Sequence, residues 1–423
     1  MKTKSMKSYL LLWSTQSLSG LGSAMTGYAL VLWLYQKTGS ALETALLSVC
    51  SYAPYVLMSI FAGALSDRWD KRKTMLVCDL LAALCTTAVL VLLRLDLLAP
   101  WHMYALNAIT GLMNTVQQPA ADVAASLLIP PEEYQRTSGL RSFSGSLTTI
   151  LTPVFASMLY AFSGVTLVVV VDLVTFAVAF TTLLCFIRIP EAPSASKAPE
   201  PLLTAARSGL RWLKTHRLIL TLIVFLAFVN LVASAFDAAL PALILPRENG
   251  GETVLGLVNG LAGVATLLGS VLVTVTPAPK NRVRAICLAL LFSLGTENFL
   301  LALGHAPIYW YVGSLLGWVT IPILNANMDV IFRTTIPVEM QGRVFSCRNT
   351  LQFFTIPLGF FLGGLLVDEV FEPLMAAVSP DGLLSRLLGT GKGSGAAMLL
   401  LLLGFAGVTV CLVFSLILRR MRE

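Results

Sequence analysis

The sequence predicts an all-α membrane protein in which twelve transmembrane helices form two pseudo-symmetric bundles of six. Three observations predict this fold class. Of the 423 residues, 56% are hydrophobic and only 12% are charged, which is more apolar side chain than a water-soluble core buries. Apolar stretches of about 20 residues, the length that crosses a bilayer, recur along the chain with short polar breaks. The first half of the chain also recurs in the second.

The predicted spans divide into two groups around one polar segment. They are 9–35, 41–66, 73–94, 101–129, 138–162 and 164–187, then 218–244, 254–276, 285–303, 306–332, 342–367 and 397–419. We therefore expect an N-terminal bundle at 1–187, a linker at 188–217 and a C-terminal bundle at 218–423. The first part of the linker is rich in proline and predicts an extended conformation. Its second part predicts an amphipathic helix with Arg207, Arg211 and Lys214 on one side, suited to an anionic lipid surface.

The distribution of positive charge predicts the orientation in the membrane. The net charge is +7, and all but five of the 29 Lys and Arg residues fall in cytoplasmic segments if the N-terminus is cytoplasmic. This bias predicts that both termini lie in the cytoplasm. A basic groove interleaved with aromatic residues is absent from the sequence, so we expect no nucleic-acid partner.

The two halves of the chain are related by an internal repeat. Asp122, Glu132 and Arg141 recur as Asp329, Glu339 and Arg348, each pair separated by 207 residues. The junction between the fourth and fifth spans therefore recurs between the tenth and eleventh. Repeated halves with a substrate site between them are typical of secondary transporters, although a channel could also be built from repeats.

Enzyme signatures are missing from the sequence. It contains no Gly-Lys-Ser/Thr nucleotide loop, no His/Glu metal pair and no nucleophile elbow. We therefore expect a protein that is not an enzyme and that needs no cofactor or metal.

The loop between the second and third spans carries the first family motif. It reads Gly63-Ala-Leu-Ser-Asp67-Arg68-Trp-Asp70-Lys71-Arg72-Lys73 and resembles the G-x-x-x-D-R-x-x-[KR]-[KR] signature of the major facilitator superfamily. The resemblance implies the major facilitator fold and a gate in which Asp67 engages the start of the eleventh helix and Lys71 pairs with Asp122. The alternative is a basic loop that only sets the topology. The gate candidates are Gly63, Asp67, Arg68, Lys71, Arg72, Asp122, Asp329 and Arg343.

A second motif narrows the resemblance to one branch of that family. The run Ile336-Pro337-Val-Glu339-Met-Gln341-Gly342-Arg343 is similar to drug:proton antiporters that include bacterial macrolide-efflux permeases. This implies a monomeric exporter in the bacterial inner membrane that moves an amphiphilic small molecule through a lipid bilayer, in exchange for protons and by alternating access. Related branches that transport siderophores or lysophospholipids provide the alternative function. The fourth span lacks the arginine that proton-coupled members often carry.

Polar stripes on apolar spans predict where a substrate binds. The resemblance implies that spans 1, 4, 7 and 10 line the central cavity, and three of them carry polar or small residues at helical spacing. These are Gln16, Gly20, Ser23 and Gly27, then Asn107, Gly111, Asn114, Gln118 and Asp122, then Asn230, Ser234, Asp237 and Pro241. Such stripes can also hold helices together. The substrate-binding candidates are Gln16, Tyr28, Asn114, Gln118, Asn230, Asp237, Trp318 and Phe353.

An acidic side chain inside a span costs free energy of insertion into the membrane, so its presence indicates a functional or structural role. Asp122 and Asp329 lie near the predicted cytoplasmic ends of their spans, where we expect them to partner loop cations. Asp172 and Glu297 fall on spans that the resemblance places at the periphery, and we expect scaffold roles for them. Asp237 alone lies within a predicted cavity-lining span, so it is the candidate for proton coupling, with a structural hydrogen-bonding role as the alternative.

Overall fold

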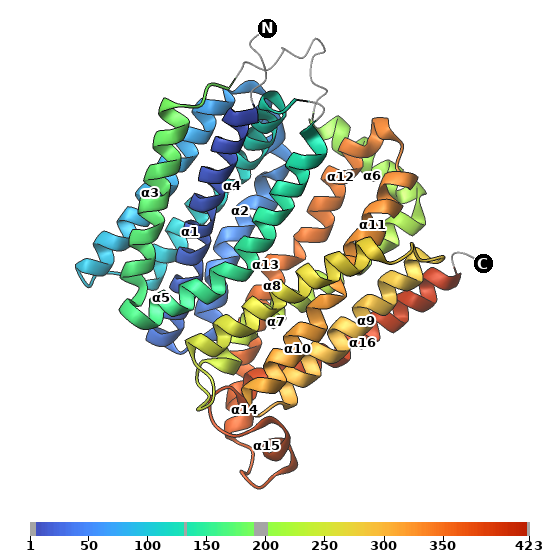
Figure 1. Ribbon diagram of the computed structural model, residues 1–423. Coiled ribbons are helices and arrows are strands. Elements are labelled where there is room, and N and C mark those ends of the chain that lie inside the picture. The colour runs from blue at the N-terminus through green and yellow to red at the C-terminus, as the bar shows by residue number, and fades with distance from the viewer. Residues whose placement is uncertain (1–5, 131–132, 190–201, 421–423) are drawn as a thin grey trace. The chain divides into compact units, whose positions relative to one another are not determined.

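The computed structural model describes residues 6–130, 133–189 and 202–420, and it is helical throughout apart from short connections (Figure 1). The chain divides into two compact units. Unit 1 consists of Met1–Trp33 and Cys50–Leu202, and unit 2 consists of Leu34–Val49 and Leu203–Glu423. The side chains of several stretches inside helices, among them 59–68 and 341–343, lie outside the described part of the chain.

Five long helices of the described chain form unit 1. They are α1 (Met6–Thr38), α2 (Ala41–Arg68), α3 (Lys71–Arg94), α4 (Pro100–Leu128) and α5 (Tyr134–Cys185). The exceptions are the end of α1 and the start of α2, which belong to unit 2. The helix α5 breaks its regular geometry at Ser163 and at Gly164, whose φ of 67° suits a residue without Cβ. This break coincides with the predicted boundary between spans 138–162 and 164–187. The helix α3 packs against both α4 and α5.

Unit 2 contains the remaining helices. They are α6 (Leu202–Thr215), α7 (Arg217–Ile244), α8 (Glu252–Val275), α9 (Arg282–Leu303), α10 (Pro307–Val319), α11 (Ile321–Thr335), α12 (Val338–Phe353), α13 (Thr355–Leu365), a π-helical segment (Leu366–Phe371), α14 (Glu372–Ala376), α15 (Leu383–Leu388) and α16 (Ser394–Arg420). The helix α16 lies alongside α9 and α7 (Figure 1). Most of the side chains of α7 are buried, so this helix forms the centre of the unit 2 core.

Ten segments of the described chain are long and apolar enough to cross a membrane. One of them, Phe143–Cys185, has 43 residues, which extend about 65 Å as helix and therefore suffice for two crossings of a roughly 30 Å hydrocarbon layer. The helix α4 has 29 residues and carries the predicted polar stripe, and it is not among these ten segments. With two arms in α5 and with α4 included, the helices correspond to the twelve predicted spans.

The amphipathic helix predicted for the second part of the linker is present as α6. Arg207, Arg211 and Lys214 are exposed on it, whereas Leu213 is buried in the core cluster that also holds Ile219. This helix is therefore anchored to unit 2 by its apolar face. The proline-rich part of the predicted linker, 190–201, lies outside the described residues.

The start of α2 belongs to unit 2, and an acidic side chain of the same unit caps it. Asp368 of the π-helical segment accepts hydrogen bonds from the backbone amides of Ala41 at 3.0 Å and Leu42 at 2.8 Å, and from the hydroxyl of Ser40 at 2.6 Å. These amides have no partner within their own helix, and a carboxylate at a helix N-terminus is also favoured by the helix dipole.

Candidate functional site

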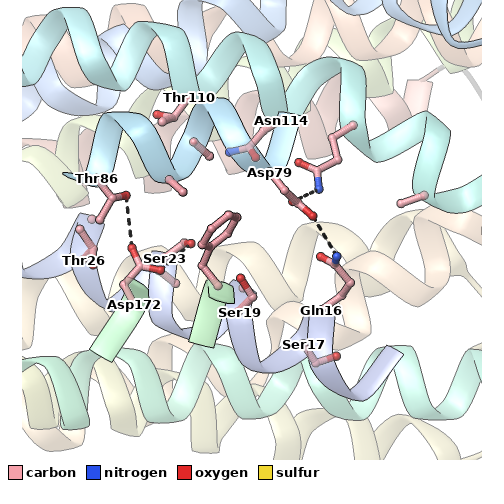
Figure 2. Close-up of a pocket in the computed structure, with 18 of the residues that line it drawn as sticks. Gln16, Ser17, Ser19, Ser23, Thr26, Asp79, Thr86, Thr110, Asn114 and Asp172 are labelled. Atoms are coloured by element: carbon pink, nitrogen blue, oxygen red, sulfur yellow. Dashed lines mark hydrogen bonds between the residues drawn. The ribbon is translucent and has the colours of Figure 1, made fainter. Parts of the chain in front are cut away.

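A cavity of about 820 Å³ lies inside unit 1, between α1, α3, α4 and α5, with Ser51 of α2 in its wall. Figure 2 shows the polar side chains that face it. Its size is within the range of small-molecule sites, which is about 300–1,000 Å³. Apolar side chains such as Leu12, Met75, Met103 and Phe176 share the wall with amides, hydroxyls and carboxylates. A wall of this kind suits an amphiphilic ligand.

The predicted polar stripe of the first span forms one wall. Gln16, Gly20, Ser23 and Gly27 all line the cavity. A Cβ added at Gly20 or Gly27 would have no heavy atom within 4 Å, so both glycines face open space. Tyr28, predicted as a substrate contact, is not among the lining residues that the structure describes.

Most of the stripe of the fourth span lines the cavity, and one of its residues packs against α2. Asn107, Asn114, Gln118 and Asp122 line the cavity. Gly111 instead meets the backbone of Ser51, because a Cβ at this position would collide with the Ser51 carbonyl. This glycine therefore permits close packing of α4 on α2.

Asp79 of α3 is held in the cavity wall by two amides. The side chain of Gln16 on α1 donates to Oδ2 at 3.0 Å, and that of Gln117 on α4 donates to Oδ1 at 2.6 Å. Three helices therefore meet at this carboxylate, which is partly exposed to the cavity (Figure 2). Hydrogen bonds to an ionised acceptor are among the stronger ones in proteins.

Asp172 occupies another position on the wall. Its Oδ1 accepts from the Ser23 hydroxyl at 2.9 Å, and its Oδ2 accepts from Thr86 at 3.5 Å (Figure 2). The α1 backbone passes close by because Gly22 has no side chain, and a Cβ there would collide with Thr175 and lie 3.0 Å from the Asp172 Cα. Asp172 lines the cavity and is not confined to the outside of the bundle as the sequence led us to expect.

The cavity wall also includes one ion pair. Arg141 near the start of α5 contacts Asp122 at 2.5 Å, and each side chain is about half exposed. The repeat-related Arg348 interacts electrostatically with Asp329. Each half therefore has an aspartate and an arginine that interact across the α4–α5 or the α11–α12 junction, at positions related by the 207-residue repeat.

The loop that carries the first motif is described only in its second half. Asp70 caps α3 by accepting from the Lys73 amide at 2.8 Å, and Lys71 is buried and donates to the Trp69 carbonyl at 2.9 Å. Arg72 donates to the carbonyls of Leu183 and Leu184 at the end of α5. The side chains of three gate candidates in this loop, and of a fourth in α12, lie outside the described part of the chain. They are Gly63, Asp67, Arg68 and Arg343.

Two acids lie close together in unit 2. Asp237 is exposed although its neighbours Phe236 and Ala238 are buried. Glu297 of α9 is buried, interacts electrostatically with Asp237 and accepts from the Trp318 indole at 2.9 Å. The indole N–H of Trp318, which was predicted as a substrate contact, therefore donates its hydrogen bond to a side chain of unit 2.

The remaining candidates of unit 2 lie at a helix contact. Asn230 of α7 donates to the backbone carbonyl of Gln352 in α12 at 3.0 Å. Phe353 ends α12 and is partly exposed. The roles proposed for these residues remain predictions.

Asp79 and Gln117 are functional candidates that the sequence analysis does not single out. Asp79 is the only acid of the span 73–94, and the cost of an acid in a span could have marked it. Gln117 precedes the predicted stripe residue Gln118 and is off the stripe by one position, or about 100° around the helix. Only the packing of α1, α3 and α4 brings the three side chains together.

Comparisons with known proteins identify a family, two efflux relatives and a solved structure of similar fold. Residues 12–360 match the sequence model described as Major Facilitator Superfamily. The macrolide efflux protein A of Streptococcus pyogenes is 23% identical over 366 residues, covering 86% of this chain and 90% of that protein. The multidrug efflux pump Tap of Mycolicibacterium fortuitum is 26% identical over 363 residues, covering 83% and 87%. The crystal structure of the nucleoside transporter NupG superposes with a TM-score of 0.71 at 12% identity, covering 96% of this chain and 98% of that chain.

Proposed function

Because the chain belongs to the Major Facilitator Superfamily, whose model covers residues 12–360, we propose that it is a secondary active exporter of amphiphilic small molecules. The family membership makes it a multi-pass membrane transporter and not an enzyme. Export is the direction named for the two relatives above, a macrolide efflux protein and a multidrug efflux pump. The substrate would be macrolide-like or one of several drugs.

The cavity of unit 1 carries this proposal. It offers about 820 Å³ with apolar side chains, hydroxyls, amides and carboxylates in one wall. A carrier for amphiphiles needs both kinds of surface, since a purely apolar cavity would not desolvate polar groups favourably. The opposing polar stripes of α1 and α4 supply the polar surface, and the side chains between them supply the apolar one.

We further propose that export exchanges substrate for protons by alternating access, with Asp237 as the coupling residue. An ionisable group that both sides of the membrane reach in turn can bind a proton on one side and release it on the other. The exposure of Asp237 and the nearby carboxyl of Glu297 support this assignment.

Reconstituted vesicles test the export proposal. Purified protein in proteoliposomes should accumulate a radiolabelled macrolide against its gradient when a proton gradient is imposed, and a proton ionophore should abolish accumulation. The substrates of the alternative function, a lysophospholipid and a catecholate siderophore, are tested in the same proteoliposomes. Accumulation of either of these in place of the macrolide would contradict drug export, and accumulation without a proton gradient would contradict antiport.

A further inference from the structure

The cavity wall of unit 1 carries more negative than positive charge. Its charged side chains in the described part of the chain are Asp79, Asp122, Asp172 and Arg141. Arg141 is paired with Asp122, so Asp79 and Asp172 have only neutral hydrogen-bond donors in the contacts described above. The wall therefore keeps a formal charge of −2, which favours a cationic ligand by Coulomb attraction in a site of reduced dielectric.

We propose that this cavity binds an organic cation, with Asp79 and Asp172 as two alternative positions for the charged group. The proposal rests on the exporter function and adds the chemical class of the substrate. Each oxygen of Asp79 accepts one amide hydrogen bond, from Gln16 or Gln117. An ionised carboxylate has about four lone-pair positions, so it can still accept from an ammonium group or pair with a quaternary cation.

The second position has an aromatic neighbour. Phe176 lies one helical turn after Asp172 and lines the same cavity. An aromatic face attracts a cation when the site is desolvated, and Asp172 itself is only 3% exposed. Carboxylate and ring can therefore bind one cationic group together.

The two positions are separated along α3. Thr86, which contacts Asp172, follows Asp79 by seven residues, or about 10 Å of helix. From this separation along α3 we infer that one ammonium group contacts one carboxylate at a time. A monocation occupies one position at a time, and a dication of suitable length spans both.

Unpartnered donors at the wall provide an independent indication of a ligand. The Tyr9 hydroxyl and the Trp13 indole nitrogen are buried, line the cavity and have no hydrogen-bond partner among the described residues. Tyr9 is 2% exposed. Both residues precede Gln16 on α1. They therefore lie within about 10 Å, along the helix axis, of the Gln16 side chain that donates to Asp79. An acceptor oxygen on the ligand can satisfy these donors, but the cationic group alone is the requirement of the proposal.

Equilibrium binding to the full-length protein in nanodiscs tests the proposal. The probes are tetraphenylphosphonium, a permanent cation, and triphenylphosphine oxide, a neutral molecule of similar size with an acceptor oxygen. We expect the cation to bind at least about tenfold more tightly than the neutral probe, since interactions with charged groups are worth roughly a factor of ten or more. Equal affinity for the two probes would overturn the proposal.

Substitutions locate the site. Because a monocation can use either position, the double variant Asp79→Asn with Asp172→Asn should weaken tetraphenylphosphonium binding by about tenfold, and each single variant should weaken it less. All three variants should leave the binding of triphenylphosphine oxide within about twofold. The matched control is Asp96→Asn, which removes one negative charge of unit 1 outside the cavity, at a φ of 54° that asparagine tolerates. An equal loss in the control would show a general charge effect and contradict the site.

A measurement on the unmodified protein covers the case in which a variant does not fold. Dicyclohexylcarbodiimide labels carboxyl groups in apolar surroundings, and mass spectrometry of the peptides reports each site. Tetraphenylphosphonium should slow labelling at Asp79 and Asp172 but not at Asp237, and absence of this protection would overturn the proposal. Export of a neutral macrolide without selection for cations would contradict the site alone, whereas cation binding without uphill export would contradict the exporter function alone.

Discussion

At the scale of single residues, Asp122 has a different partner from the one that the family motif implies. The resemblance pairs it with Lys71, whereas the structure gives it Arg141 at 2.5 Å. Lys71 is buried and donates to the carbonyl of Trp69. The pair with Lys71 remains a prediction for a state of the transport cycle in which the loop is rearranged.

Charge exchange distinguishes the two partners. Reversing Asp122 alone should impair transport, and the double variant Asp122→Arg with Arg141→Asp should recover part of it, because the attraction is restored. A half-exposed ion pair contributes only about 0.2–1 kcal/mol to the stability of the folded protein. The transport rate is therefore a more sensitive measurement than the free energy of unfolding. Recovery by Asp122→Lys with Lys71→Asp, and not by the Arg141 exchange, would favour the motif-based pair.

Asp237 provides a second test at this scale. Asp237→Asn keeps the size and much of the hydrogen bonding of the side chain but cannot titrate. We expect the variant to bind substrate while uphill export driven by a proton gradient collapses in proteoliposomes. The control is Asp381→Asn, an exposed acid between α14 and α15. Wild-type accumulation with wild-type pH dependence in Asp237→Asn would transfer the coupling role to another acid, with Glu297, Asp79 and Asp172 as the candidates.

At the scale of helices, glycines determine how closely neighbours approach. A Cβ at Gly363 of α13 would lie 2.7 Å from the Cα and the carbonyl oxygen of Ala235 in α7. Both atoms belong to the backbone, so a local rotamer change cannot relieve the collision. Gly359 meets the Leu231 carbonyl of α7 in the same way, so both glycines permit the close contact between α13 and α7.

We expect Gly363→Ala to destabilise the protein by about 1–3 kcal/mol, the usual range for overpacking. Gly20→Ala is the control, because its added methyl group faces open space and alanine favours the helix by about 0.5–1 kcal/mol. Thermal unfolding in detergent, followed by tryptophan fluorescence, measures both. A lower melting temperature for Gly20→Ala than for Gly363→Ala would contradict the packing account.

At the scale of the whole molecule, the positive charges predict a topology. All but five of the 29 Lys and Arg residues fall in cytoplasmic segments if the N-terminus is cytoplasmic. We therefore expect a green fluorescent protein fused after Glu423 to be fluorescent in a bacterial host. Alkaline phosphatase fused after Asp381, in the segment between α14 and α15, should be active because this segment is expected to be outside. The opposite pair of results would reverse the orientation.

The sequence by itself determines the fold class, the family, the division of α5 at Gly164 and the polar stripes of α1 and α4. These features depend on local composition and helical spacing, which one chain segment expresses alone. Helical spacing is therefore sufficient to place Gln16 on the polar face of α1, and Asn114 and Gln118 on the polar face of α4.

Only the tertiary structure decides which side chains form the cavity. Asp79 acquires its role from Gln16 and Gln117, and Asp172 acquires its role from Ser23 and Thr86. These partners are 38–149 residues away in the chain, so no periodic pattern connects them. Their proximity results from the packing of separate helices, which depends on contacts such as those at Gly22 and Gly111.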